Sequence, residues 1–227
     1  MTSTQPELYS PGRSRGLADV FSHRYLLKLL VRKEIKVRYR GSVLGLLWSY
    51  VKPAVQFLVY YIALGVFLGL DRGVPNFPIY LFAGIVVVNF FTESIRNSTK
   101  SILDNSGLIN KIYLPRELFP VASVWVSAIH FFPQVLVLIV GALITGWQPN
   151  LYHLGAAILG FVILALFSLG LGLFFGSINV LFRDSENFVE LISMVATWAS
   201  PVLYLGAMVK ATLGGTVYFF YQLNPIT

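Results

Sequence analysis

The chain has 227 residues, of which 56% are hydrophobic and only 12% are charged, and its mean hydropathy is +0.71. This composition is far from that of a soluble domain and indicates a polytopic membrane protein. The formal net charge of +7 would favour nucleic acid as a partner in a soluble protein, but here the cations lie beside apolar segments. The positive-inside rule accounts for them there, so no nucleic acid is expected. Cysteine is absent, which excludes disulfides and thiolate sites.

The first 41 residues divide into a tail and a basic amphipathic segment. Residues 1–19 are expected to be a solvated tail that contains Ser, Pro and Gly. Over 20–41, cations recur every four residues while Leu, Val and Ile fill another helical face. Such a helix can lie along the membrane surface with its cations toward anionic lipid. We therefore expect an interface helix that ends near Arg38, Tyr39 and Arg40, followed by a transmembrane domain over 42–227.

Five apolar stretches are predicted to cross the bilayer, since a helical span needs about 20 residues. They cover approximately 50–70, 77–91, 121–146, 154–181 and 188–205. With the amino terminus inside, only Arg72 and Lys210 of the 17 Lys and Arg residues fall outside. This bias favours a cytoplasmic amino terminus. The predicted fold is an all-α, multi-pass integral membrane protein.

Two connections differ from simple turns. The inner loop 93–119, between the second and third spans, is the longest hydrophilic connection after the amino terminus. Its composition fits either a solvated loop or a partner-binding segment. Region 201–224 is divided by glycines into pieces too short to span singly, so it is expected to form a re-entrant or surface-lying helical hairpin on the outer side.

Four aromatic residues gather on one side of the first predicted span. They are Tyr50, Phe57, Tyr60 and Tyr61. The stripe fits helix packing with an interfacial belt, and it also fits the lining of a ligand pathway. In the third span, the intramembrane polar residues His130 and Gln134 fit either a functional site or bonding to a neighbouring helix.

Motifs for catalysis and nucleotide binding are not found in the sequence. The spacing of Gly172 and Gly176 permits close helix approach, but Ser177 follows without the lysine of a phosphate-binding loop. No His-Glu-x-x-His, Gly-x-Ser-x-Gly or carboxylate cluster at metal spacing occurs. We therefore expect no enzyme activity, no metal site and no cofactor on this chain, and a pathway that takes its energy from a partner.

Five segments, in chain order, carry a resemblance to a known family. They are 36–45 with Trp48 and Lys52-Pro53, 111–117, 182–184, 200–201 and 224–227. Together they extend over nearly all of the chain after the tail. They resemble the permease subunits of type-2 ABC exporters, in the branch that exports polysaccharide, lipopolysaccharide O-antigen or teichoic acid.

The resemblance implies a homodimer of six-span subunits in the inner (plasma) membrane, with two separate ABC subunits that bind ATP and Mg. It implies export of a lipid-linked glycan, and a sixth span is expected after Thr227. A short coupling helix would contact the ATPase through Asp104, Asn105, Ser106, Gly107, Leu108, Ile109, Asn110 and Lys111. Two short outer helices within 201–224 would form a gate. The aromatic stripe would then line the glycan channel, since sugar C–H faces stack on aromatic rings.

Two alternatives remain open at this stage. The same architecture serves for export of a drug or small lipid in related branches of the family. A membrane-embedded glycosyl or acyl transferase is the other, but it would need an acid, base or metal site, and none is visible in the sequence.

Overall fold

The computed structural model describes residues 16–70, 74, 76–112, 114–148, 150–202, 204, 208–210, 215–222 and 224. Within these ranges all regular structure is helical. The amino-terminal helices are α1 (Leu17–Ser22), α2 (Arg24–Arg38), the 3-10 turn η1 (Gly45–Leu47), α3 (Trp48–Tyr60) and the π-helix η2 (Tyr61–Phe67). The remaining helices are α4 (Phe77–Asp104), α5 (Ser106–Ile109), α6 (Leu118–Ile144), α7 (Leu151–Leu181), α8 (Ser185–Ala199) and α10 (Gly215–Gln222).

Four helical segments in the described ranges are long and apolar enough to cross a membrane. They are Gly45–Phe67, Phe77–Asp104, Leu118–Ile144 and Leu151–Leu181. Each contains most of one of the first four predicted spans, so the prediction of an all-α, multi-pass membrane protein is confirmed. Residues 1–15 of the predicted tail, and 203, 205–207, 211–214 and 223 of the predicted outer region, lie outside the described residues.

The stretch predicted as a fifth span forms α8, which has only 15 residues. At 1.5 Å per residue it reaches about 22 Å, short of a hydrocarbon core of about 30 Å. The helix ends because Ser200 is extended, with φ −94° and ψ 146°, as residues before proline commonly are. The predicted number of five spans is therefore not confirmed.

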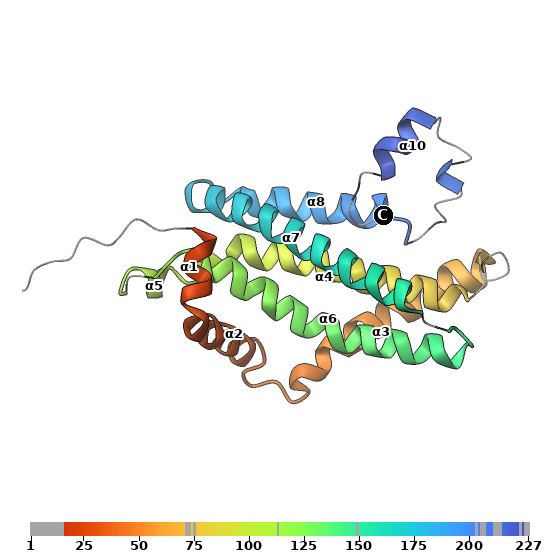
Figure 1. The fold of residues 1–227 in the computed structure, drawn as a ribbon, viewed down its shortest axis with the longest axis horizontal. Coiled ribbons are helices and arrows are strands. Elements are labelled where there is room, and N and C mark those ends of the chain that lie inside the picture. Colours follow the sequence, from red (N-terminus) through yellow and green to blue (C-terminus); the bar gives the residue numbers. More distant parts are fainter. Residues whose placement is uncertain are drawn as a thin grey trace, which may run out of the picture.

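Helix α4 lies at the centre of the bundle (Figure 1). It packs against α3, α6, α7 and α8, and Figure 1 shows it running between α6 and α7. The main core joins Phe90, Phe91 and Ile95 of α4 to Leu164 of α7 and Val189 of α8. Because α4 contacts all these helices, its polar residues lie where several elements meet.

Helices α4 and α7 approach closely at two glycines. A Cβ built on Gly172 would lie 2.4 Å from the Cβ of Ser98, and one on Gly176 would lie 3.2 Å from the Ser98 carbonyl oxygen. The close approach that the glycine spacing permits therefore occurs within this chain, between α7 and α4.

The amino-terminal helices pack on the first turns of α6. Val20 of α1 and Leu30 of α2 are buried against Leu118, Phe119 and Ala122. The cations on the opposite face of α2 are largely exposed. This packing gathers α1, α2 and α5 at one end of the bundle (Figure 1).

Candidate functional site

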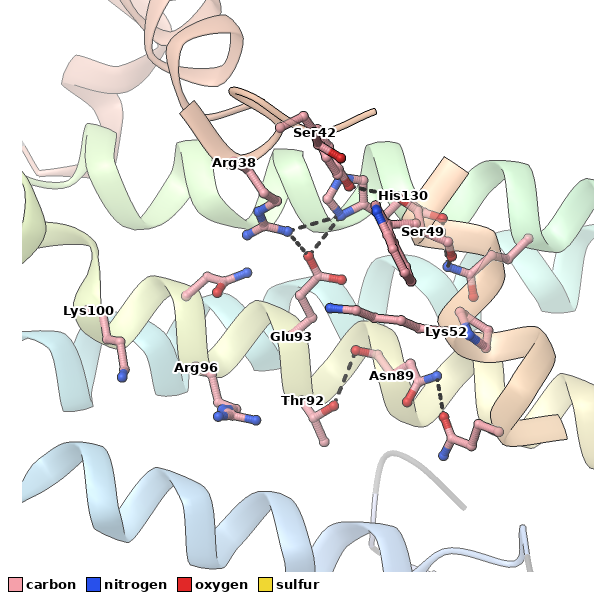
Figure 2. A pocket seen from close by; sticks show the side chains of 16 residues that line it. Arg38, Ser42, Ser49, Lys52, Asn89, Thr92, Glu93, Arg96, Lys100 and His130 are labelled. Atoms are coloured by element: carbon pink, nitrogen blue, oxygen red, sulfur yellow. Dashed lines mark hydrogen bonds and ion pairs between the residues drawn. The ribbon is translucent and has the colours of Figure 1, made fainter. Parts of the chain in front are cut away.

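A polar cavity of about 860 Å³ lies between α3, α4 and α6, beside the carboxyl end of α2 (Figure 2). Its charged lining residues are Arg38, Lys52, Glu93, Arg96 and Lys100. Its neutral polar lining residues are Tyr39, Ser42, Ser49, Gln56, Asn89, Thr92, Asn97, His130 and Gln134. A cavity with this lining is unusual among helices apolar enough to cross a membrane, where polar side chains mark binding sites or pathways.

Glu93 of α4 is the centre of a hydrogen-bonded network that fastens α2 to the bundle. Its Oε1 contacts the guanidinium of Arg38 and the Nδ1 of His130, the latter at 2.8 Å. The Nε2 of His130 lies 3.1 Å from the hydroxyl of Tyr39, which is also 2.7 Å from the hydroxyl of Ser49. The network thus joins the carboxyl end of α2 to α3, α4 and α6.

The contacts of His130 are compatible with the following arrangement of protons, in which the Nδ1 that faces Glu93 also lies 3.2 Å from the guanidinium of Arg38. If Nδ1 of His130 carries the proton, it donates to Glu93 while Nε2 accepts from Tyr39, and Tyr39 in turn accepts from Ser49. Arg38 donates to the same carboxylate oxygen, so that oxygen is bonded on two sides. His130 is only 4% exposed, and every heteroatom of its ring is used.

Gln134 and Asn97 leave polar atoms unmatched beside the cavity. The amide of Gln134 donates to the carbonyl oxygens of Ser49 and His130, at 3.1 and 3.0 Å. Among the described residues, its Oε1 has no hydrogen-bond donor and the Nδ2 of Asn97 has no acceptor. Buried polar atoms are usually satisfied, and these two are exceptions that lie within the packed bundle rather than on the open wall of the cavity.

Two cations of the cavity pair with carboxylates of α8. Lys100 lies 2.8 Å from Glu186, and Arg96 lies 3.9 Å from the exposed Glu190. The hydrogen bond from Lys100 lowers the pKa of Glu186, and a second one from Asn179 of α7 acts in the same direction. At pH values above its usual pKa, the ionised carboxylate of Glu186 therefore stabilises the folded bundle. This contribution is lost as the pH falls through the lowered pKa.

The residues of the predicted coupling helix lie at the end of the bundle that α1 and α2 share. Asp104 ends α4, Ser106 begins the single turn of α5, and Asn110 and Lys111 follow it. Leu108 and Ile109 pack on the cluster of α2 and α6, while Asn105 is buried and accepts from Lys33 of α2. Asp104, Ser106, Gly107, Asn110 and Lys111 are exposed. The segment thus presents an exposed polar surface and is held on the bundle by the side chains of Leu108 and Ile109.

The aromatic stripe packs mainly on α4. The ring of Phe57 stacks on Tyr61, with centroids 5.9 Å apart, and meets Phe82 edge-on at 5.6 Å. Tyr60 and Tyr61 join the same cluster around Phe77. Tyr50 is half-buried away from that cluster, and none of the four residues lines the polar cavity.

The face of α3 that does line the cavity is a different one, and the sequence reasoning missed it. It carries Ser49, Lys52 and Gln56, spaced by three and four residues on one helical side. That spacing of polar residues in an otherwise apolar span was a usable signal. The pairing of Arg38 with Glu93, 55 residues apart, had no such signal in the sequence.

Comparisons with known proteins agree on one family. The family model described as ABC-2 type transporter matches residues 25–227. The chain is similar to the O-antigen export system permease protein RfbA of Klebsiella pneumoniae, with 30% identity over 201 residues that cover 88% of this chain and 75% of that protein. A protein of the same name from Myxococcus xanthus is 30% identical over 190 residues, which cover 84% and 72%. The polysialic acid transport protein KpsM of Escherichia coli is 21% identical over 180 residues, which cover 78% and 69%.

Proposed function

The chain belongs to the ABC-2 type transporter family, and on this basis we propose that it is the channel-forming permease of an ATP-driven exporter of lipid-linked polysaccharide. The exporter acts across the inner (cytoplasmic) membrane, with the amino terminus of this chain in the cytoplasm. The names of its relatives, which refer to O-antigen export and polysialic acid transport, support a glycan as the substrate.

The main support for the proposal is the polar cavity between the apolar helices α3, α4 and α6. A cavity of about 860 Å³ accommodates a polar group inside the membrane region. Within the described residues no three His, Asp or Glu side chains gather as metal ligands. The cavity walls instead offer hydrogen-bond donors, acceptors and cations, which serve for binding and passage.

The energy comes from a partner in this account. A separate ABC subunit binds ATP and Mg, and the segment from Asp104 to Lys111 contacts it. The exposed polar side of this segment and its packing on α2 and α6 support a role as the coupling helix, because such a helix has to transmit motion from the ATPase to the bundle. We propose an interface helix at 20–41, a coupling loop at 93–119 and an outer gate at 201–224. In the interface helix, Arg38 and Tyr39 bond to Glu93 and His130, while the exposed Arg40 faces membrane lipid.

A second copy of the chain completes the pathway. On α3, apolar side chains including Val55, Leu58 and Val59 are 55% exposed, and in the membrane they face lipid or the second subunit. Because the cavity is lined on one side by α3, a homodimer built through this helix would bring two cavities toward a common pathway.

Reconstitution of the chain with its ABC partner tests the proposed substrate. Vesicles containing the complex are expected to move a fluorescent lipid-linked polysaccharide in an ATP-dependent manner and to leave a drug-like cation or a short-chain phospholipid in place. Transport of the small compounds without transport of the glycan would point to the drug or small-lipid alternative. Glycosyl or acyl transfer without ATP would point to a transferase.

The aromatic stripe gives a prediction for the channel. Phe57→Ala and Tyr61→Ala are each expected to lower glycan export by roughly fivefold, since removal of a stacking ring costs about 1 kcal/mol. Phe57→Leu restores packing on Phe82 without a ring, and Phe67→Ala removes an aromatic residue that is 79% exposed at the end of η2. Export is measured with the amount of co-purified ATPase as the check on assembly.

The controls separate stacking from stability. Phe57→Leu should export poorly although it assembles, and Phe67→Ala should export like the unaltered chain. Export at the unaltered rate by both alanine variants would remove the channel role of the stripe.

A further inference from the structure

Tyr80 lies near the first residue of the membrane-crossing helix α4, where it meets the chain that leaves α8. Its hydroxyl donates to the carbonyl oxygens of Pro201 and Tyr204, the latter at 3.1 Å. A phenol has one hydrogen, which the two carbonyl oxygens share. At 1.5 Å per residue, Tyr80 is roughly 5 Å along the helix from Phe77. The orientation proposed above places this end of α4 on the outer side of the membrane.

The chain leaves α8 in a tight turn that satisfies only part of its own backbone. The hydroxyl of Ser200 donates to the carbonyl of Ala196, and the carbonyl of Ser200 accepts from the nitrogen of Val202 at 2.7 Å. For the carbonyl of Pro201, the described part of the chain provides the hydroxyl of Tyr80 as donor. Lipid supplies no donors, so the loss of this hydroxyl inside the membrane region would leave backbone carbonyls unpaired.

Val202 packs on α4 at a glycine. Its side chain is only 5% exposed and belongs to a hydrophobic cluster with Leu81 of α4. A Cβ built on Gly84 would lie 2.9 Å from both Cγ atoms of Val202, so any side chain there would push Val202 away. Tyr80 and Gly84 are four residues apart on one face of α4, and together they hold the neighbouring residues Pro201 and Val202.

The same hydrophobic cluster includes part of the aromatic stripe of α3. Phe57, Tyr60 and Tyr61 pack against its buried residues, among which is Val202. In the proposed function these rings line the glycan pathway. Because all three are half-buried in the cluster, their faces become available to a sugar only when the cluster opens.

We propose that Tyr80 is a positioning residue that holds Pro201 and Val202 against α4, and that this contact keeps the outer end of the pathway closed when no ATP is bound. The inference rests on the proposed function, and it adds the contact that closes the pathway at rest. Opening requires the release of one hydroxyl contact and one valine side chain, while the other helices stay packed.

The experiment measures leak and export with the complete complex and its ABC partner in vesicles. The release of an entrapped small fluorescent dye is followed without ATP, and the export of lipid-linked glycan is followed with ATP. Both rates are divided by the amount of assembled complex. The variants are Tyr80→Phe, which removes only the hydroxyl, Gly84→Ala, and Gly84→Ala combined with Val202→Ala.

Two control variants leave this contact intact. Tyr152→Phe removes a hydroxyl from a tyrosine that is 86% exposed near the start of α7. Gly176→Ala disturbs the bundle elsewhere, because the added Cβ would lie 3.2 Å from the carbonyl oxygen of Ser98 at the contact of α7 with α4. The second control therefore separates lower stability from loss of closure.

Tyr80→Phe is expected to raise dye release about tenfold, because unpaired carbonyls weaken the closed state. Its export of glycan with ATP should stay within about twofold of the unaltered rate, since the hydroxyl acts on the closed state. Gly84→Ala should also leak, and the added Val202→Ala should reduce that leak because it returns the space. Both control variants should retain the dye.

Dye retention by both Tyr80→Phe and Gly84→Ala would overturn the assignment. A leak of equal size from Gly176→Ala would also overturn it, because lower stability alone would then open the pathway. If the unaltered complex does not export glycan with ATP, the proposed function itself has failed. Dye release is measured without glycan or ATP, so the two failures are distinguishable.

Discussion

Replacing Gly172 by leucine is expected to destabilise the helix bundle strongly. The first added carbon would lie 2.4 Å from the Cβ of Ser98, well inside the separation of about 3.5–4.0 Å that two carbon atoms prefer. Ser98 cannot move away easily, because it is fully buried and its hydroxyl donates to the carbonyl of Pro120. Overpacking of this kind costs about 3 kcal/mol or more. The melting temperature in detergent should fall by roughly 6–12 °C, or the protein should not be recovered as a single species.

Gly170 provides the matched control on the same helix. It lies two residues away on α7, and a Cβ there would meet no atom within 4 Å. Gly170→Leu should therefore melt within about 2 °C of the unaltered chain, since exposed substitutions rarely cost much. Similar melting of the Gly172 and Gly170 variants would show that α4 and α7 do not pack through this glycine.

Replacing Gly107 by tryptophan is expected to disconnect transport from ATP hydrolysis while the chain still folds. A Cβ added at Gly107 would meet no atom within 4 Å and the residue is exposed, so we expect a tryptophan there to extend into solvent without disturbing the bundle. It would, however, stand on the exposed surface that we propose contacts the ATPase. Disruption of a central interface contact typically costs about 2 kcal/mol or more, so ATP-dependent export should fall roughly thirtyfold. Export into vesicles and the amount of ATPase recovered with the permease are the two measurements.

Gly155→Trp is the control for this substitution. Gly155 is equally open and lies near the start of α7, far along the bundle from α5. The Gly155 variant should insert, bind the ATPase and export normally. Normal ATP-dependent export by the Gly107 variant would contradict the coupling role of α5.

The sequence was sufficient to predict the apolar helices but not their packing partners. The first four spans are marked by long apolar runs, and runs of that length have few alternatives to a membrane helix. The length of the fifth predicted span was overestimated because apolar residues continue past Pro201, whereas the helix α8 ends at Ala199. Apolar composition reports burial or lipid contact, but only backbone geometry shows where a helix stops.

The candidate site was predicted in part for a similar reason. His130 and Gln134 were recognisable as polar residues inside a span, and both line the cavity. Their partners come from α2, α3 and α4, and pairs such as His130 and Glu93, 37 residues apart, have no periodic signature. The polar face of α3 is periodic, with Lys52 at its middle, but periodicity alone does not show which elements pack against that face. The tertiary contacts, rather than the residue types, show which cations of the cavity lining have carboxylate partners among the described residues.

The dependence of this permease on a separate motor is tested most directly by export rates in three preparations of otherwise identical vesicles. They contain the permease alone, the permease with its ABC partner, and the permease with a partner whose ATP hydrolysis has been inactivated by mutation. With ATP and Mg present, we expect export of the lipid-linked glycan only in the second preparation. Export at a comparable rate by the permease alone, or with the inactivated partner, would contradict the account.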